Sequence, residues 1–455
     1  MKKSLYLWGI LFGIIGILGI AGVKTIADAQ DQVVITQKTL EGDILAAEGI
    51  TFQIRNEWSG RIGWKTTATV DNKVPGGLVT DTRVTKMWES STRSLFPAYF
   101  ADRDVIELSF SADAYRIYYA SGGEAWYEEA VSAVADRTGM GETHTEVIKW
   151  KDYCEFFPLI EEYDIDYLYV NLDEQPHSIS EMLQIQIPDT YEVEISVTRN
   201  DEGEVIQIRD LYDQRISIQS EAVRVDDGIY FTVSARQEDE MGKVTVLQSA
   251  LGNGIYYLPL VPTRDSLVAM DFANMKKVYS FSDEVCVEEL VLDEERKYLL
   301  VFAVEAEEMR LYTMDRKDMA IKSEITLFPC KEVQSDPVIE NIGGNLLLLR
   351  NSGDVAFLTK EEPGVYTGFM TYNLGAEVML PNSYGWQYAV DYQEGRLALI
   401  CCESSWACST YVYVFDQTGL LYKGYYRHSA DDEDEDSPWD IEMIEENALS
   451  IRWHK

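Results

Sequence analysis

The stretch that most constrains the fold is residues 395–426, which reads GRLALICCESSWACSTYVYVFDQTGLLYKGYY. It predicts a tight turn, an apolar strand, a short polar loop, a second strand rich in Tyr and Val, a turn at 416–419 and a third strand. Runs of β-branched and aromatic residues bounded by Gly, Asp, Asn and Ser are typical of an antiparallel meander. The sequence therefore predicts antiparallel β structure in this region.

Looser copies of this pattern recur along the chain. Turns of the same type contain Lys297, Gly344, Gly395 and Asn447, which follow one another at intervals of 47, 51 and 52 residues. A period near 50 residues with three or four strands per unit is the size of a β-propeller blade. We expect an all-β, antiparallel, propeller-like domain of about seven blades over residues 31–455. The alternative is a pair of tandem β-sandwiches whose hairpins are evenly spaced.

The two ends of this region are expected to meet. The last strand, residues 448–453, has no hairpin after it and needs a partner from elsewhere in the chain. The early strand Val33 to Thr36 is the expected partner. Such a pairing closes the ring and leaves no exposed sheet edge.

One region departs from the repeating plan, at about residues 120–165. Trp126, Ala130, Val131 and Val134 fall near one face of a helix over residues 124–136. A second short helix is expected over residues 149–162. We therefore expect a small helical insertion that packs on the β domain.

The N-terminus predicts a location. Residues 5–23 form a 19-residue run without a charge, after a basic tail at residues 1–3. As a helix this run is about 28 Å long, close to the roughly 30 Å hydrocarbon thickness of a bilayer. It exceeds the usual 7–15 residues of a signal-peptide core, which favours a retained transmembrane anchor at residues 4–23; cleavage after the small residues at 27–29 is the alternative. The chain is thus expected to span the cell membrane once, with its bulk extracytoplasmic.

The apolar run also contains a small-residue pair. Gly9 and Gly13 form a GxxxG spacing that allows close contact with a second membrane helix, although glycine is common in membrane helices generally.

Residues just after the apolar run carry a family resemblance. The apolar run followed by Gly42-Asp43 and then residues 48–52, EGITF, resembles the start of membrane-anchored surface proteins of Gram-positive bacteria. The resemblance covers about the first 70 residues. It implies a place at the cell surface and brings no catalytic residue with it.

The charge excludes one class of partner. The chain carries 78 acidic against 39 basic residues, a formal charge of −39. No nucleic-acid binding is expected, because the phosphate backbone would be repelled and no basic stripe is present. Such a field attracts cations and basic peptides, but it also serves simply to keep a protein soluble.

No motif for catalysis, a cofactor or a metal stands out. The four histidines lack metal-site spacing, and there is no GxSxG, phosphate-binding loop or dinucleotide fingerprint. Neighbouring carboxylates at residues 161–162, 164 and 166, and 226–227 would suit glycoside hydrolysis, yet such pairs arise by chance in so acidic a chain. The run at 431–436, DDEDED, is similar to a calcium loop but lacks the glycine at its sixth position, and Met443 replaces the bidentate Glu, so a solvated loop is expected.

The cysteines suggest one disulfide. Cys402 and Cys408 could face each other across the loop at residues 403–407, with a stabilisation of about 2 kcal/mol. Cys401 would point to the opposite face of the sheet. The cysteines at 154, 286 and 330 are expected to be buried thiols.

These features favour a non-enzymatic function. We expect a membrane-anchored extracytoplasmic binding or scaffolding protein for a peptide, a glycan or a membrane partner. The 28 Tyr and 10 Trp residues suit carbohydrate or peptide recognition, and equally the packing of blades. The alternatives are an extracellular glycan hydrolase that uses paired carboxylates and a sensor subunit of a membrane complex.

Overall fold

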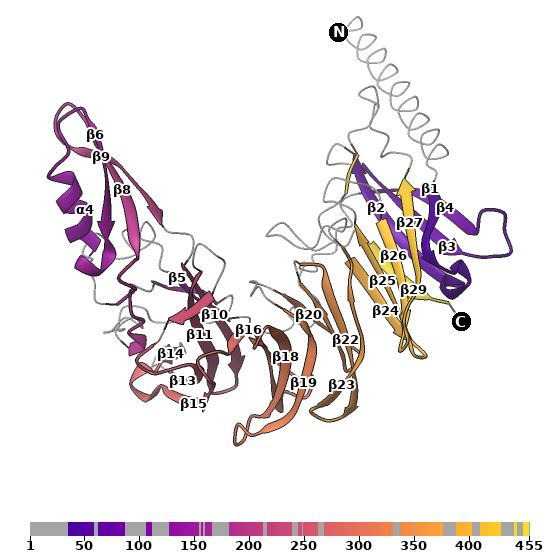
Figure 1. Ribbon diagram of the computed structural model, residues 1–455. Coiled ribbons are helices and arrows are strands. Elements are labelled where there is room, and N and C mark those ends of the chain that lie inside the picture. The colour runs from indigo at the N-terminus through magenta and orange to yellow at the C-terminus, as the bar shows by residue number, and fades with distance from the viewer. Residues whose placement is uncertain are drawn as a thin grey trace, which may run out of the picture. The chain divides into compact units, whose positions relative to one another are not determined.

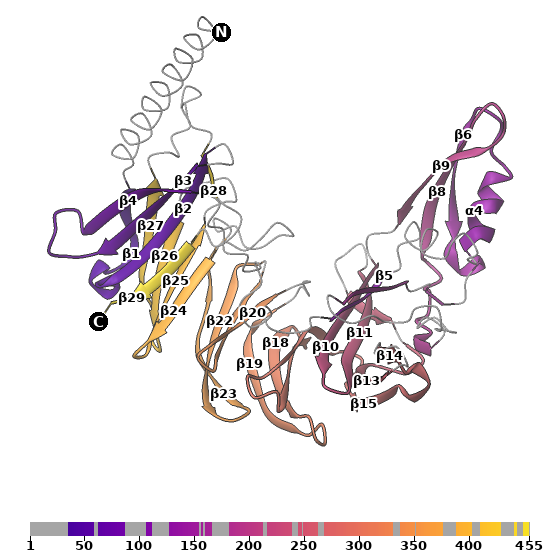
Figure 2. The same ribbon diagram turned by 180° about the vertical axis from the view of Figure 1, so that it is seen from behind.

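The computed structural model describes most of the chain beyond residue 34. The described residues are 35–58, 62–86, 106–111, 127–153, 156–157, 160–165, 182–212, 216–238, 244–247, 249–262, 268–330, 337–350, 352–375, 388–402, 410–428, 441–443 and 449–454. They form antiparallel sheets with few helical residues (Figures 1 and 2). The prediction of an all-β antiparallel chain is therefore confirmed.

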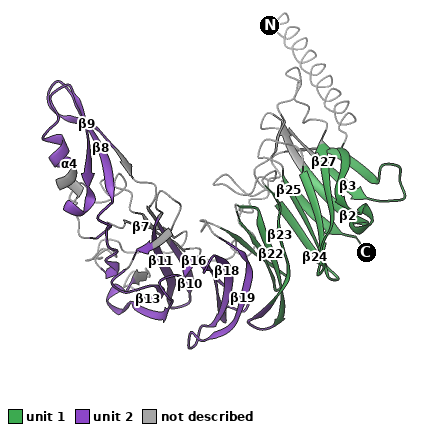
Figure 3. Cartoon of the chain, in the orientation of Figure 1, with its two compact units in different colours: residues 1–101, 337–361, 367–455 green, residues 102–336, 362–366 purple. Residues whose placement is uncertain are grey.

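The chain divides into two compact units (Figure 3). Unit 1 comprises residues 1–101, 337–361 and 367–455, and unit 2 comprises residues 102–336 and 362–366.

The described residues of unit 1 form three sheets. The first sheet consists of β2 (Ile50–Trp58), β3 (Ile62–Val70), β4 (Leu78–Lys86), β28 (Ile441–Met443) and β29 (Leu449–Trp453). The second sheet has the order β20 (Val338–Ile342), β21 (Asn345–Leu349), β22 (Asp354–Glu362) and β23 (Val365–Asn373). The third sheet has the order β24 (Tyr388–Gln393), β25 (Arg396–Cys402), β26 (Thr410–Asp416), β27 (Gly419–His428) and β1 (Ile35–Gly42).

The third sheet has a hydrophobic core on each of its faces. Alternate residues of β25 and β26, such as Ile400 and Val412, pack with residues of the first sheet. The residues between them, such as Leu399 and Tyr413, pack with residues of the second sheet. Successive side chains of a strand point to opposite faces, so burial on both sides requires the nearly continuous apolar runs seen in the sequence. A two-layer sandwich differs, because one face of each sheet is then polar.

The first and last strands of the chain pair with each other's region, but not in the combination that the sequence predicted. The pairing of Val33–Thr36 with residues 448–453 is wrong for the residues described: β29 pairs with β2, from Ile50↔Trp453 to Ile54↔Leu449. Strand β1 instead pairs with β27, from Ile35↔His428 to Gly42↔Tyr422.

A turn after β1 explains this exchange. Gly42 has a φ of +73°, and a Cβ there would lie 1.9 Å from the backbone oxygen of Leu421. Only glycine fits this close approach. The following 3₁₀ helix, Ile44–Ala47, then leads the chain from the third sheet to the first.

Where the structure describes unit 2, its strands form four sheets. The six-stranded sheet consists of β10 (Ile216–Val225), β11 (Gly228–Glu238), β12 (Val244–Leu247), β13 (Gly254–Pro262), β14 (Val268–Met270) and β15 (Lys276–Ser280). A four-stranded sheet has the order β16 (Cys286–Leu292), β17 (Tyr298–Glu305), β18 (Glu308–Asp315) and β19 (Ile321–Pro329). A three-stranded sheet has the order β6 (Thr143–Lys149), β8 (Glu192–Arg199) and β9 (Val205–Tyr212), and β5 (Ile106–Ser111) pairs with β7 (Ile160–Ile165).

The six-stranded sheet is also covered on both faces. Residues such as Phe231 and Leu258 pack in a core with the three-stranded sheet and α4 (Tyr127–Ala135). Residues such as Tyr230 and Ile255 pack in a second core with the four-stranded sheet.

The repeat seen in the sequence corresponds to one sheet. The markers Lys297, Gly344 and Gly395 each lie between the first and second strands of a four-stranded meander: β16–β19, β20–β23 and β24–β27 respectively.

The insertion is only partly helical. The helix expected at 124–136 is confirmed as α4, whereas the second helix, at 149–162, is wrong. Within this range the structure has only a short 3₁₀ helix, Trp150–Asp152, among the described residues, and residues 160–165 form strand β7. Residues 143–149 add a further strand, β6, because they pair with β8 along their whole length.

The anchor prediction lies outside the described residues. No helix within the described ranges combines the length and the apolar character that crossing a membrane requires. Residues 4–23, and with them Gly9 and Gly13, precede the first described residue.

Candidate ligand-binding cavity

A cavity lies where the ladder of hydrogen-bonded strands in unit 2 is interrupted. One edge of β11 pairs with β10 from Val225↔Gly228 to Ile216↔Gln237. The other edge pairs with β13 along residues 228–231 and with β12 along residues 235–238. Residues 232–234 therefore face neither strand on this edge.

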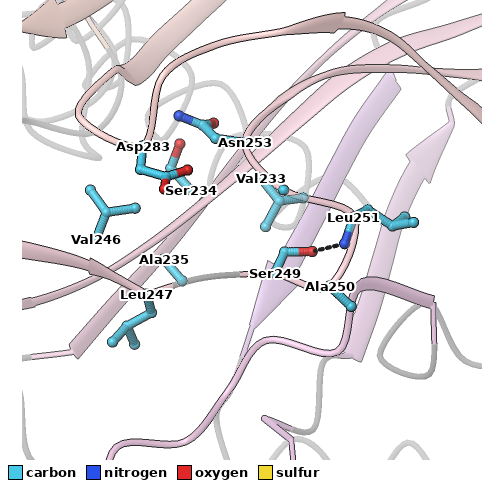
Figure 4. A pocket seen from close by; sticks show the side chains of 11 residues that line it. Val233, Ser234, Ala235, Val246, Leu247, Ser249, Ala250, Leu251, Asn253 and Asp283 are labelled. Atoms are coloured by element: carbon cyan, nitrogen blue, oxygen red, sulfur yellow. Dashed lines mark hydrogen bonds between the residues drawn. The ribbon is translucent and has the colours of Figure 1, made fainter.

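The cavity occupies about 300 Å³ beside this gap (Figure 4). Its lining combines apolar and polar side chains. The apolar lining residues are Val233, Ala235, Val246, Leu247, Ala250 and Leu251, and the polar ones are Ser234, Ser249, Asn253 and Asp283. A concave site that places polar groups beside apolar walls can bind and orient a small molecule.

The loop at residues 249–253 forms one wall and is held at its first residues. The Ser249 hydroxyl donates to the backbone oxygen of Leu183 at 2.5 Å and accepts from the backbone N–H of Leu251 at 3.2 Å. The backbone N–H of Ala250 donates to the same oxygen of Leu183 at 2.9 Å. This end of the loop is thus fixed to the segment that precedes β8.

The other end of the loop is fixed by two side chains. The hydroxyl of the buried Tyr256 donates to the backbone oxygen of Gly252. Burial raises the pKa of Tyr256 to about 12, so this hydroxyl keeps its proton at neutral pH. The Asn253 side-chain NH₂ donates to the backbone oxygens of Ser282 at 2.8 Å and Val285 at 2.6 Å. The cavity therefore has a preformed wall.

Glycine is required where this loop returns to the sheet. A Cβ on Gly254 would lie 2.1 Å from the backbone oxygen of Tyr279 on the neighbouring strand β15. No other residue fits that approach without moving the strand.

A row of buried polar side chains begins at the cavity. Thr232, Ser234 and Arg236 lie on one face of β11 and are buried, as are Cys286 and Glu288 on β16. Burial raises the pKa of the Cys286 thiol, and Arg236 and Ser234 act in the opposite direction. Since the thiolate is the reactive form, Cys286 is not an activated nucleophile.

Two of the carboxylates considered for glycoside hydrolysis, Asp226 and Asp227, do not line this cavity. Asp226 and Asp227 are exposed in the turn between β10 and β11. The backbone oxygen of Asp227 accepts from the Tyr257 hydroxyl, which is a structural role. Residues 161, 162 and 164 lie in β7, but their side chains, like residue 166, are outside the described part of the chain.

The remaining predicted sites are only partly described. Cys402 is buried in the third sheet of unit 1, and the strand register places Thr410 opposite it. Cys408 and the acidic run at 431–436 lie outside the described residues. Among the residues that the structure describes, no group of three or more His, Cys, Asp or Glu side chains is arranged to hold a metal.

Sequence reasoning did not single out this cavity. Thr232, Ser234 and Arg236 alternate with apolar residues along β11, a pattern normally typical of a strand with one solvated face. The small residues of Ser249–Gly254 indicate a break between two strands, but not that the break leaves a hollow.

Comparisons with known proteins give only distant similarity. No protein-family model matches the chain, and no curated protein matches it. Among solved structures, a periplasmic gluconolactonase from Pseudomonas aeruginosa is similar, with 12% identity, 82% of this chain and 81% of that chain covered, and a TM-score of 0.25. A protein from Lactobacillus plantarum is similar with 10% identity, 89% of this chain and 99% of that chain covered, and a TM-score of 0.26. Similarity this distant carries no argument about activity.

Proposed function

We propose that this chain is an extracytoplasmic binding protein, held at a membrane by its N-terminal apolar segment, whose cavity in unit 2 takes a small ligand. The observation that carries the proposal is the cavity itself: about 300 Å³, lined by apolar and polar side chains together, and walled by a loop that hydrogen bonds fix at both ends. Such preorganisation favours binding, because little conformational entropy is then lost when a ligand enters.

The polar groups of the cavity favour binding over hydrolysis. Glycoside hydrolysis requires two carboxyl groups about 5–10 Å apart. Within the described residues, Asp283 is the one carboxylate that lines the cavity. The nearby thiol of Cys286 is held in its protonated form by burial.

The charge of the chain limits which ligands can enter. Asp283 lines the cavity, and the whole chain has a formal charge of −39. An anionic ligand would be repelled by both, so the ligand is neutral or cationic.

Fragment binding to the full-length chain tests this function. Saturation-transfer NMR with a set of neutral and cationic fragments is expected to find ligands that the variant Ala250→Phe loses, because the added ring would fill the cavity. The matched variant Val205→Phe alters an exposed residue of β9 away from the cavity and should leave binding unchanged. The absence of any fragment that distinguishes the two variants would contradict the proposal.

We also infer that the sheets are blades of a propeller-like ring with about seven members. The support is the meander of four strands in each period, the seven sheets of the described residues, and the cores on both faces of the third and six-stranded sheets. A closed ring of some 420 residues should have a radius of gyration of about 22 Å, which small-angle scattering of residues 31–455 would measure. A clearly larger radius would contradict closure.

The location has its own test. A fusion of alkaline phosphatase to the C-terminus, in a Gram-positive host, is expected to be active, since the enzyme requires an oxidising compartment for its disulfides. An inactive but intact fusion would place the bulk of the chain in the cytosol and contradict the proposal.

A further inference from the structure

The backbone of Val233 presents a donor and an acceptor to the cavity. The backbone N–H of Leu260 donates to the oxygen of Asp227 at 3.0 Å, which sets the alternation between β11 and β13. In an antiparallel pair every second residue is hydrogen-bonded, so Ile229 and Phe231 bond to β13 as well. Val233 is the next residue in that series.

No described strand lies opposite Val233 on this edge. The pairing with β13 ends at Phe231, and the pairing with β12 begins at Ala235. The N–H and C=O of Val233 therefore point to the gap that the cavity adjoins, and Val233 is one of the lining residues. This is the arrangement that an added strand or a single peptide group can complete.

Two lining side chains also have hydrogen-bonding capacity left over. The hydroxyl of Ser234, a residue only 4% exposed, has no hydrogen-bond partner. The Cys286 thiol lies near this hydroxyl, but not in hydrogen-bonding geometry. The side-chain oxygen of Asn253 is also without a partner, although its NH₂ group makes two bonds. Buried polar groups are rarely left unsatisfied, so these atoms indicate a missing partner.

We propose that the cavity binds a secondary amide with an apolar substituent, as in one peptide unit of a short peptide. The ligand N–H donates to the backbone oxygen of Val233, and the ligand carbonyl accepts from the backbone N–H of Val233. The apolar substituent packs against Val246, Leu247 and Leu251. This inference rests on the proposed binding function and names the ligand class of the same site.

The size of the cavity limits the ligand to a single unit. Ligand pockets usually measure about 300–1,000 Å³, and this cavity, at about 300 Å³, lies at the lower end. Either a peptide unit with one side chain or the acetamido group of an N-acetylated sugar would supply the amide. The two sources share the amide and differ in what is attached to it. The apolar wall residues favour the peptide, because it carries an apolar side chain.

The test changes the ligand, so that folding of the protein is unaffected. Calorimetric titration of the full-length chain in nanodiscs would compare the N-methylamide of 4-methylpentanoic acid, which has a single secondary amide, with the methyl ester of the same acid, in which an ester oxygen replaces the amide N–H. The methylamide is expected to bind at least about tenfold more tightly, because an unmatched buried acceptor loses a hydrogen bond of about 1.5 kcal/mol. Ala250→Phe should weaken methylamide binding at least tenfold, and Val205→Phe should leave it unchanged.

Other outcomes separate the two proposals. N-acetylglucosamine binding more tightly than the methylamide would assign the amide to a sugar and keep the ligand class. Equal binding of the ester and the methylamide would overturn the amide inference. If Ala250→Phe then abolished the binding of both ligands, the binding function of the cavity would still be supported. Amide binding that is indifferent to Ala250→Phe would overturn the inference, and the fragment screen would then decide the binding function separately.

Discussion

The hydroxyl of Tyr388 donates a hydrogen bond of 2.8 Å to Oε2 of Glu340, and this bond links the first strands of the second and third sheets of unit 1. Burial raises the pKa of Glu340, and the bond from Tyr388 lowers it by less. Burial also raises the pKa of Tyr388 well above its ordinary value, so the phenol stays protonated and acts as the donor. A carboxylate here is thus desolvated at neutral pH.

The variant Glu340→Gln is expected to stabilise the protein at pH 7. The folded-state pKa of Glu340 is raised above the unfolded value near 4.5, so its favourable contribution is complete below pH 4.5 and is lost as the pH rises through the folded pKa. A glutamine still accepts from Tyr388 but carries no charge to desolvate. Thermal unfolding should show a higher midpoint for the variant at pH 7 and a shrinking difference towards pH 4.

The control for this prediction is Glu41→Gln, at an exposed position of β1. It should change the midpoint little at either pH. A lower midpoint for Glu340→Gln at pH 7 would show that the charge of Glu340 is stabilising and that the sign of the argument is wrong.

Truncation of either of two consecutive side chains in β25 should destabilise the protein. Leu399 and Ile400 have no exposed surface, and they belong to cores on opposite faces of the third sheet. Leu399→Ala and Ile400→Ala are each expected to lower the free energy of unfolding by about 2–5 kcal/mol. Leu40→Ala, at an exposed position of β1, should change it by less than about 0.5 kcal/mol in denaturant unfolding.

This pair tests the stacking of the sheets directly. In a strand with one solvated face, one of two neighbouring positions tolerates alanine. A near-neutral result for either Leu399→Ala or Ile400→Ala would therefore contradict a core on both faces.

A disulfide should lock the two ends of the chain together. Gln53 and Ser450 lie directly opposite each other in the pairing of β2 with β29. The Cα atoms of directly opposite residues are about 4.5–5.5 Å apart, within the Cα range of about 4.4–6.8 Å that a disulfide bridges. The double variant Gln53→Cys with Ser450→Cys is expected to gain about 2–4 kcal/mol under oxidising conditions, seen as a rise in the unfolding midpoint that reduction reverses.

The pair Gln53→Cys with Arg452→Cys serves as the control. Arg452 lies opposite Thr51, so its side chain is diagonal to Gln53. Equal crosslinking of the two variants would indicate that this register does not hold.

Loss of the Asn253 side chain should loosen the wall of the cavity. Asn253→Ala removes an exposed bond to the oxygen of Ser282 and a partly buried bond to the oxygen of Val285, and the expected cost is about 0.5–1.5 kcal/mol for each bond lost. Asn274→Ala, whose side chain bonds to the exposed Asp271, should cost less. Hydrogen exchange is the measurement: amides of residues 249–253 should lose protection in Asn253→Ala and keep it in Asn274→Ala.

The sequence predicted the meanders well because burial on both faces leaves a strong local signal. The strands at 396–402 and 410–416 are almost wholly apolar, and the turn at 416–419 separates β26 from β27 as expected. The partners of the end strands were not predictable in the same way. The sheet edge that β1 joins depends on the turn at Gly42 and its close approach to Leu421. The periodicity of apolar residues in the sequence does not predict that long-range contact.

The cavity could not be predicted from the sequence, for a different reason. Alternation in β11 assigns Thr232, Ser234 and Arg236 to one face, but whether that face meets water depends on whether another sheet covers it. The helix expected over 149–162 failed similarly, since short apolar runs fit a helix or a strand and pairing with distant residues decides between them.

The pairing of the ends has a consequence for the order of synthesis. Thr36 and Arg427, which face each other in the ladder of β1 and β27, are 391 positions apart. The ribosome releases the early strands first, so β1 and β2 must wait with unpaired edges until the last strands emerge. Contacts of such long separation form slowly, and waiting edges invite aggregation. Unit 1 therefore completes its folding only after translation ends. Its yield of folded protein should depend on chaperones that shield the nascent strands.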